Sequence, residues 1–395
     1  MSETSHSSEN PFLPRFEFAS RTQLIFGINS VERIGELAKN LPAKRILLVT
    51  DAGIVAAGHA DRVRKILEGE NLFISVFDQV KENPTTRCVE SCLQVARVNK
   101  IDALIGLGGG SSMDTAKGCN FLLTNGGEMK DYWGVGKATK LMLPLIAIPT
   151  TAGTGSECQS AALIADEITH QKMACLDPKA AARIALLDPT LTLSQPKRVT
   201  ACTGIDAIAH ALETAVTRKR NPISQVFSRE AFRLTAAHFE RVLENPSDLT
   251  SRGAMLLGAA FAGLAIENSM LGAAHAAANP LTAQFGIAHG HAVGIMLPHV
   301  IRFNSEEKNT RQIYGEMAMG AGLSTAGDEA VCAELINWLQ RILRRAELPA
   351  SLSQCELEPS SIPGLAKEAS EQWTATFNPR DVTEFDFREI YQNAF

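Results

Sequence analysis

The chain has 395 residues, more than one ordinary hydrophobic core organises, so we expect two domains. Hydrophobic residues make up 45% and charged residues 21%, as in a soluble globular protein, and the net charge is −5. The sequence has no basic cluster, which argues against nucleic-acid binding. The eight cysteines are scattered without a C-x-x-C pair, which favours reduced thiols in a cytoplasmic protein over a disulfide framework.

The two segments that most resemble targeting or membrane sequences have other interpretations. Residues 1–16 begin with MSETSHSSENP, which lacks the basic and apolar regions of a signal peptide, and we expect a flexible N-terminus. Residues 253–278 are rich in Ala and Gly but contain Glu267, Asn268 and His275. A buried helix or helix pair in a large core fits this stretch better than a membrane span.

The first half of the chain alternates short apolar runs with stretches of helical periodicity. Unbroken apolar runs predict strands of a parallel sheet covered on both faces at residues 45–50, 72–77, 102–108 and 143–149. Helical spacing lies between them, at residues 59–70 and 86–100. This alternation predicts a doubly wound, Rossmann-like α/β domain. Residues 160–165 and 172–177 are expected to add a hairpin to it.

The pattern changes after residues 186–196, where Pro189 and Pro196 mark a boundary. From about residue 198 onward the periodicity is helical, with little that indicates strands. We therefore predict an α/β domain over residues 17–195, followed by an all-helical domain over residues 196–395. A cleft between two such domains is a common place for a ligand.

A glycine-rich turn, LIGLGGGSSMDTAKG (residues 104–118), follows a predicted strand and opens a helix. Gly109 and Gly110 allow close approach of the backbone to a ligand, and Ser111 with the helix N-terminus offers N–H groups to a phosphate. Asp114 lies one turn into the helix, where it either caps the helix or contacts the ligand. The pattern is not the G-x-G-x-x-G fingerprint, and a tight structural turn is the alternative.

A second polar loop, IPTTAGTGSE (residues 148–157), also follows a predicted strand. Its hydroxyl groups, from Thr150, Thr151 and Ser156 among others, suit phosphate, ribose or carboxamide contacts; a solvated loop is the alternative. Both loops are expected at the carboxyl edge of the sheet, where open α/β sheets bind ligands. Asp51, after the strand at 45–50, is placed to accept hydrogen bonds from an adenosine ribose, which favours NAD over NADP, or to cap a helix.

Four side chains in the second half form a candidate metal site. Asp206 and His210 lie four apart on one helical face, although such a pair is also compatible with a local ion pair. His275 and His289 lie in a nearly uncharged segment, where uncompensated imidazoles are costly. One aspartate and three histidines suit a divalent transition metal.

Taken together, these motifs resemble the iron-containing alcohol dehydrogenases. The resemblance rests on GGGSSMDTAKG, PTTAGTGSE, GIDAIAHALE, HAAANPL and GIAHGHAVGIMLPHV, and it runs over nearly the whole chain. It implies a dehydroquinate-synthase-like fold, an NAD(P)-binding first domain and a helical metal-binding domain. It also implies one divalent metal, Fe²⁺ or else Zn²⁺, and a homodimer or higher homo-oligomer without membrane partners.

The resemblance also implies roles for individual residues. The metal ligands are then Asp206, His210, His275 and His289. The cofactor contacts are then Asp51, Gly109, Gly110, Ser111, Asp114, Thr150, Thr151, Ser156 and Lys172.

One position departs from the pattern of the family. Many members have a second histidine four residues after the third ligand, near nicotinamide and substrate, and this chain has Asn279 there. Asparagine forms hydrogen bonds but does not shuttle protons near neutral pH. We expect Asn279 to face the reaction, and His291 either to replace the missing proton carrier or to be a structural histidine.

The expected reaction is hydride transfer between nicotinamide and a metal-bound alcohol or aldehyde. Alternatives within the fold are a zinc polyol dehydrogenase, a dehydroquinate-synthase-like lyase, a metal-free reductase of the maleylacetate type, and a hydroxyacid-oxoacid transhydrogenase. An assembly or binding protein on an inactive dehydrogenase scaffold is a further alternative. The intact set of four ligands argues against that last interpretation.

Overall fold

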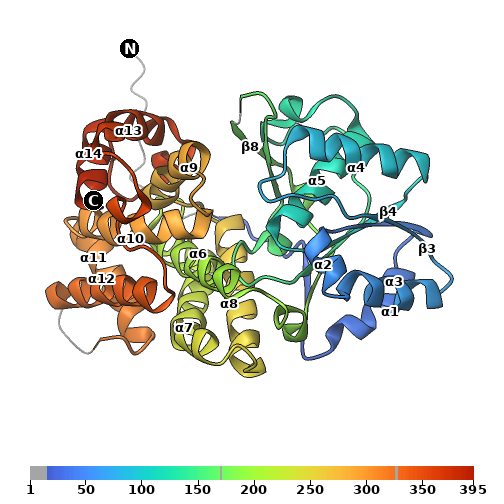
Figure 1. Cartoon of the computed structure of the whole chain (residues 1–395), viewed down its shortest axis with the longest axis horizontal. Coiled ribbons are helices and arrows are strands. Elements are labelled where there is room, and N and C mark those ends of the chain that lie inside the picture. Colours follow the sequence, from blue (N-terminus) through green and yellow to red (C-terminus); the bar gives the residue numbers. More distant parts are fainter. Residues whose placement is uncertain (1–15, 170, 325–327) are drawn as a thin grey trace, which may run out of the picture.

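The computed structural model describes residues 16–169, 171–324 and 328–395. Figure 1 shows two halves side by side, an α/β half on the right and a helical half on the left. The predicted flexible segment at residues 1–16 lies almost entirely outside the described residues.

The α/β half is built on a parallel sheet. Within the described residues this sheet has six strands in the order β1-β9-β6-β4-β2-β3, and neighbouring strands are parallel. The strands are β1 (Gln23–Phe26), β2 (Arg45–Val49), β3 (Phe73–Phe77), β4 (Ala103–Gly108), β6 (Leu145–Pro149) and β9 (Ile184–Leu187). The four strands predicted from apolar runs are confirmed, whereas the four-residue strands β1 and β9 were not predicted.

Helices cover both faces of this sheet because successive strand residues point to opposite sides. Leu47 and Val49 of β2 pack with α4 (Thr86–Val98) and α5 (Gly110–Asn125). Ile46 and Leu48 of the same strand pack on the other side, with α1 (Ile34–Lys39) and α3 (His59–Gly69). The short helix α2 (Ala52–Ala56) follows β2 directly. The doubly wound arrangement is therefore confirmed.

The predicted hairpin is present but belongs to a second sheet. Strands β7 (Ala161–Ala165) and β8 (Lys172–Leu176) pair in antiparallel fashion. The two-residue strand β5 (Gly134–Val135) pairs with β8, which gives a sheet of three strands among the described residues. Ile164 of β7 packs in the same core as α4 and α5, so this small sheet covers that side of the α/β half.

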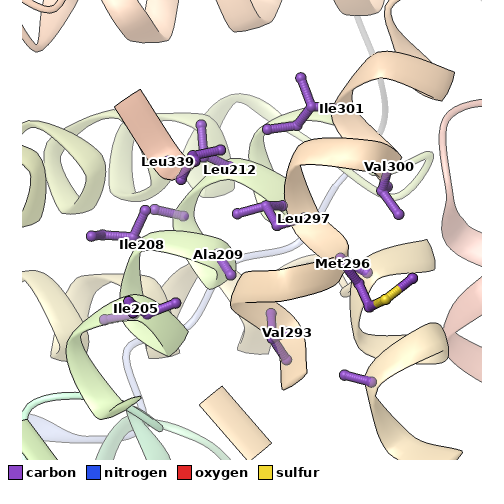
Figure 2. Close-up of a cluster of buried hydrophobic side chains, with 14 of the residues drawn as sticks. Ile205, Ile208, Ala209, Leu212, Val293, Met296, Leu297, Val300, Ile301 and Leu339 are labelled. Atoms are coloured by element: carbon purple, nitrogen blue, oxygen red, sulfur yellow. The ribbon is translucent and has the colours of Figure 1, made fainter. Parts of the chain in front are cut away.

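The second half is helical, as predicted. Its helices are α6 (Lys197–Val216), α7 (Pro222–Glu244), α8 (Leu249–Glu267), α9 (Ala273–Phe285), α10 (His289–Asn304), α11 (Lys308–Gly320), α12 (Asp328–Arg345), α13 (Ile362–Glu371) and α14 (Glu384–Asn393). Helix α6 is central, and its residues are buried almost without interruption from Thr200 to Val216. Figure 2 shows side chains of α6, such as Ile208 and Leu212, packed against Leu297 and Ile301 of α10.

The apolar stretch at residues 253–278 forms a buried helix pair, α8 and α9. Among the described residues, α8 is the one helix long and apolar enough to cross a membrane, yet 67% of that segment is buried inside the protein. It packs extensively along α7, which explains its apolar composition without a membrane.

Close backbone contacts connect the elements that carry the polar motifs. At Gly155, in the loop after β6, and at Gly263 of α8, an added Cβ would lie 2.6 and 2.3 Å from the backbone of the opposite segment. At Gly290, at the start of α10, an added Cβ would lie 2.0 Å from the carbonyl oxygen of Cys202 in α6. Helix α6 is thus held against α10, and the loop after β6 is held against α8.

Candidate active site

The candidate residues from both halves surround one cavity. It has a volume of about 990 Å³ and is lined by every residue predicted to bind cofactor and by all four predicted metal ligands. The linings come from the carboxyl ends of β2, β4 and β6, from β8, and from α6, α9 and α10. Because β4 and β6 are adjacent and parallel, their two loops meet at the same edge of the sheet, as predicted.

The glycine turn opens α5 toward this cavity. Gly109 precedes the helix in extended backbone, and the first helical residues, Gly110 and Ser111, line the cavity. The free N–H groups of a helix start provide a site for an anionic group. A Cβ at Gly110 would lie 2.8 Å from the side chain of Thr154, so the glycine is needed for packing of the two loops as well as for access to a ligand.

Asp51 both lines the cavity and caps a helix. Its Oδ1 accepts hydrogen bonds from the backbone N–H groups of Gly53 and Ile54 at the start of α2, at 2.9 and 3.1 Å. Its Oδ2 accepts no hydrogen bond from the part of the chain that the structure describes, and it lies 3.3 Å from the place of a Cβ on Gly108. The capping role is therefore present, and the second oxygen is left for a ligand in the cavity.

Ser156 and Asp114 are part of an internal polar network. The Ser156 hydroxyl donates to Asp114 Oδ1 at 2.8 Å and accepts from Lys117 Nζ at 2.8 Å. Lys117 is fully buried and also donates to the carbonyl oxygens of Ser156 and Ala161, at 2.7 and 2.9 Å. Burial raises the pKa of Asp114 and lowers that of Lys117.

Lys117 was not singled out from the sequence. It lies in the quoted glycine-turn motif, but its partners are 39 and 44 residues away along the chain. The structure shows that it joins α5 to the loop after β6 and to β7. By contrast, the predicted Lys172 lies at the exposed start of β8 and lines the cavity.

The four predicted metal ligands lie around Asp206 Oδ1, and the ligand atoms of Asp206, His210 and His275 are within 4.8 Å of one another. Asp206 and His210 lie on α6, His275 on α9 and His289 at the first position of α10. The Nε2 atoms of the three histidines lie 3.4, 3.4 and 3.9 Å from Asp206 Oδ1. The rings of His210 and His275 stack with their centroids 4.7 Å apart.

The atoms at the centre of this cluster are suited to a cation. Asp206 Oδ1 and His275 Nε2 are buried and have no hydrogen-bond partner among the residues that the structure describes. Buried polar atoms are normally paired, so two such atoms side by side indicate that a ligand completes the site. Three imidazoles and one carboxylate are the donor set expected for a divalent transition metal.

Electrostatics within the cluster depend on the carboxylates. Burial alone would raise the pKa of Asp206, but the neighbouring imidazoles hold it below its usual range. Burial opposes protonation of His275, yet Glu213 and Asp206 outweigh it and raise its pKa to about 9. Burial lowers the pKa of His289 to about 3 and keeps its imidazole neutral, as metal ligation requires.

Glu213 is a functional residue that the sequence did not reveal. Its carboxylate forms a hydrogen bond with Nδ1 of His275 and accepts another from the backbone N–H of Ala274 at 2.7 Å. This contact fixes the ring so that Nε2 faces the cluster. Glu213 lies on α6, seven residues after Asp206 and three after His210. This spacing places it near the predicted ligands on the helix and was the one sequence feature that pointed to it.

The two residues predicted to be catalytic lie in different surroundings. Asn279 lines the cavity, one helical turn beyond His275, and its side-chain amide donates to Gln372 Oε1 at 3.0 Å. His291 is buried and is not among the cavity-lining residues; its Nε2 pairs with the carbonyl oxygen of Pro349 at 2.8 Å. The structure thus places Asn279 on the cavity wall and pairs His291 with the backbone outside the cavity lining.

A cavity between a doubly wound sheet and a helical half that carries a cluster of metal-type ligands is typical of an oxidoreductase that uses a nucleotide and a metal ion. Sequence profiles described as "Iron-containing alcohol dehydrogenase" and "Fe-containing alcohol dehydrogenase family, C-terminal" match residues 21–189 and 200–395. The chain belongs to the iron-containing alcohol dehydrogenase family. It is an oxidoreductase that acts on CH–OH groups with NAD and a metal ion.

Individual relatives agree with this assignment. The chain is 32% identical to an NAD-dependent methanol dehydrogenase of Bacillus methanolicus, over 94% of this chain and 97% of the relative. It is 34% identical to a choline dehydrogenase of Bacillus subtilis, over 96% and 94% of the two chains. The structure of a 1,3-propanediol oxidoreductase matches with a TM-score of 0.93 and 28% identity, over 97% of this chain and all of that one.

Proposed function

We propose that the protein interconverts a small primary alcohol and its aldehyde with NAD(H), in the cavity between residues 17–195 and residues 196–395. The observation that carries this proposal is the shared cavity, which both nucleotide loops and the unpartnered atoms of Asp206 and His275 border. A metal ion held there would act as a Lewis acid on the substrate oxygen, and the nicotinamide would exchange the hydride.

The roles of the protein residues follow from their contacts. Asp206, His210, His275 and His289 hold the metal, and Glu213 orients His275 through Nδ1. The N-terminus of α5, at Gly109, Gly110 and Ser111, receives the pyrophosphate. Thr150, Thr151 and Lys172 border the nicotinamide half of the dinucleotide.

The remaining features of the nucleotide site concern the ribose and the shape of the loop. Asp51 accepts from the adenosine ribose through Oδ2, and its charge disfavours the extra phosphate of NADP. Lys117, Asp114 and Ser156 hold the loop after β6 in shape through their mutual hydrogen bonds. We further propose that the enzyme is cytoplasmic and forms a homodimer or larger homo-oligomer, as its family relationship suggests.

The test combines metal analysis with turnover. The purified protein is expected to contain about one equivalent of iron or zinc per chain, and to oxidise NADH in the presence of a panel of short aldehydes. Removal of the metal with a chelator should abolish turnover, and Fe²⁺ or Zn²⁺ should restore it. A metal-free protein that turns over, or a metal-loaded protein inactive with every aldehyde and alcohol of the panel, would contradict the proposal.

A further inference from the structure

Two uncharged amide side chains, Asn279 and Gln372, lie on the cavity wall beyond the metal cluster. The amide of Asn279 donates to Gln372 Oε1 at 3.0 Å. Asn279 Oδ1 and Gln372 Nε2 have no hydrogen-bond partner within the described part of the chain. The buried hydroxyl of Thr374, on the same wall, also lacks a partner there. This wall therefore offers hydrogen bonds that the protein itself does not use.

The position of this amide pair relative to the metal cluster indicates what it would contact. Asn279 lies four residues after His275 on α9, so it occupies the same helical face, about 6 Å farther along the helix axis. Ile266, Met270 and Leu271 contribute apolar surface to the cavity nearby in sequence. A substrate whose reacting oxygen lies at the metal cluster would thus extend its remaining atoms toward Asn279 and Gln372.

The chemistry of the pair selects among polar groups. It offers one free acceptor, Asn279 Oδ1, and free donors on Gln372 Nε2, and a hydroxyl group both donates and accepts. A carboxylate would face the carbonyl oxygen of Asn279 without a donor between them. A quaternary ammonium group would leave the Gln372 donors unmatched. An alkyl group would displace water from both amides without replacing its hydrogen bonds, which is unfavourable.

We propose that Asn279 and Gln372 together bind a second hydroxyl group of the substrate, so that the enzyme prefers small diols and hydroxyaldehydes to plain alcohols of equal size. This inference rests on the proposed alcohol dehydrogenase activity and adds the substrate class. In this chain, asparagine at position 279 is therefore a specificity-determining residue, whose role is substrate recognition rather than proton transfer.

The test compares substrates of equal length in which a terminal methyl group replaces a hydroxyl. The pairs are ethane-1,2-diol with propan-1-ol, propane-1,3-diol with butan-1-ol, and butane-1,4-diol with pentan-1-ol. In the wild-type enzyme, kcat/KM for the diol should exceed that for its partner by about tenfold or more at one chain length, because a site built to hydrogen-bond a hydroxyl rejects the analogue that lacks it.

Three variants assign this preference to the amide pair. In Asn279→Leu and in Gln372→Leu the ratio of diol to alkanol kcat/KM should fall to about one, and the double variant should lose little more, because the two residues act together. Gln284→Leu is the matched control. Gln284 lies on the same helix and pairs with Glu368 of α13 at 2.7 Å, but it does not line the cavity, so its ratio should remain that of the wild type.

Binding measurements separate recognition of the substrate from other effects. Calorimetric titration of the diol into the metal-loaded NADH complex should show weaker binding to Asn279→Leu, while metal content and the dissociation constant of NADH stay unchanged. A diol-to-alkanol ratio near one in the wild type at every length would overturn the inference, and so would an unchanged ratio in Asn279→Leu. Weaker NADH binding in that variant would assign the amide to the cofactor and also overturn it.

These outcomes are distinct from failure of the proposed function. Equal turnover of diols and alkanols rejects the role of the amide pair and leaves the alcohol dehydrogenase activity intact. An enzyme loaded with metal and NAD(H) that turns over neither series, nor the corresponding aldehydes, rejects both.

Discussion

At the scale of single residues, Glu213 shows how a carboxylate outside the ligand set shapes the metal site. It is 3% exposed, and its two oxygens are engaged by the imidazole of His275 and the backbone N–H of Ala274. We expect Glu213→Gln to weaken metal binding by about 10- to 100-fold, because the neutral amide neither fixes the ring as firmly nor raises its basicity. Metal content after dialysis against graded chelator concentrations measures this effect.

Two further variants provide a positive and a negative control for metal binding. His275→Ala removes a ligand and should abolish metal retention while leaving the protein folded. His59→Ala changes a half-buried histidine that is paired with Ser194 and lies outside the cluster, and it should leave the metal content unchanged. Full metal content in His275→Ala would reject the assignment of the ligands.

Asp51 carries the predicted preference between the two nicotinamide cofactors. Its Oδ1 is used in the cap of α2, and its Oδ2 is the charge that an adenosine 2′-phosphate would meet. We expect Asp51→Gly to raise kcat/KM with NADPH relative to NADH, with some loss of stability from the lost cap, on the order of 1 kcal/mol. Steady-state kinetics with both cofactors measure the ratio, and equal use of both by the wild-type enzyme would refute the role given to Asp51.

His299 should make the free energy of unfolding depend on pH. It lies on α10, is 8% exposed, and its Nδ1 lacks a partner among the described residues. Burial, reinforced by Arg302, lowers its pKa from 6.5 to about 4. Between these values the unfolded chain binds a proton that the folded chain does not. The free energy of unfolding therefore falls as the pH drops from about 6.5 to 4, by up to roughly 3 kcal/mol.

Replacing the ring tests this dependence. We expect His299→Leu to show a smaller loss of stability than the wild type between pH 6.5 and 4. Urea unfolding at several pH values, with metal removed from both proteins by chelator, provides the comparison. Parallel stability curves for the two proteins would show that His299 does not contribute.

At the scale of elements, the contact between Gly155 and Gly263 fixes a nucleotide loop against a helix of the other half. A methyl group at position 263 would lie 2.3 Å from the carbonyl oxygen of Gly155. Gly263→Ala should therefore displace the loop after β6, lower stability by about 1 to 3 kcal/mol and weaken NADH binding.

A glycine in open surroundings provides the control for that variant. Gly69, at the end of α3, has nothing within 4 Å of an added Cβ, so Gly69→Ala should leave stability the same or raise it by less than about 1 kcal/mol. Thermal unfolding and NADH fluorescence titration report both effects. Normal NADH affinity in Gly263→Ala would show that the loop tolerates the displacement.

The sequence predicts long, regular elements better than short ones. Strands β2, β4 and β6 have continuous apolar runs and are buried almost throughout, as a sheet covered on both faces requires. Strand β3, at the edge of the sheet, is mostly not buried, but its apolar residues still made it recognisable. Strands β1 and β9 have four residues each, and β5 has two, too few to show a period. Their strand conformation depends on neighbours that the fold supplies.

The same distinction applies to the site. The members of the candidate metal cluster were recognisable because histidine and aspartate are costly in an apolar segment, which made each of them conspicuous. Lys117 and Gln372 were not, because each acts through a partner at least 39 residues away, and no local pattern encodes such a pairing. The spacing of Glu213 from His210 was visible in the sequence, but it does not reveal the contact with His275. His291 resembled a catalytic histidine by its position, but its partner is the carbonyl oxygen of Pro349, 58 residues away.

At the scale of the whole molecule, the metal ion and the nucleotide are proposed to bind to different structural elements. The metal residues lie on α6, α9 and α10, whereas the nucleotide loops follow strands of the sheet, so neither ligand is needed to shape the other site. We expect metal-stripped protein to remain folded and to bind NADH with an affinity within a few-fold of that of the loaded enzyme.

Thermal or urea unfolding of the four ligation states tests this independence. Each ligand at 100 times its dissociation constant should add about 2.7 kcal/mol to the free energy of unfolding, and the two increments should sum. Loss of NADH binding on metal removal, or increments far from additive, would show that the two halves are coupled through the cavity.

The contact of Gly290 with Cys202 also bears on the choice of ion. Position 290 has no space for even one carbon atom, and it follows directly after His289, while Asp206 lies one turn beyond Cys202 on the opposing helix. Two donors of the ion are thus set at a spacing dictated by backbone contact rather than by the ion. A metal site whose ligands are already in position loses little conformational entropy when the ion binds. It discriminates among ions by how well the distance between its ligand atoms suits each ion. A wider residue at position 290 should therefore change the order of preference between iron and zinc before it destroys the site.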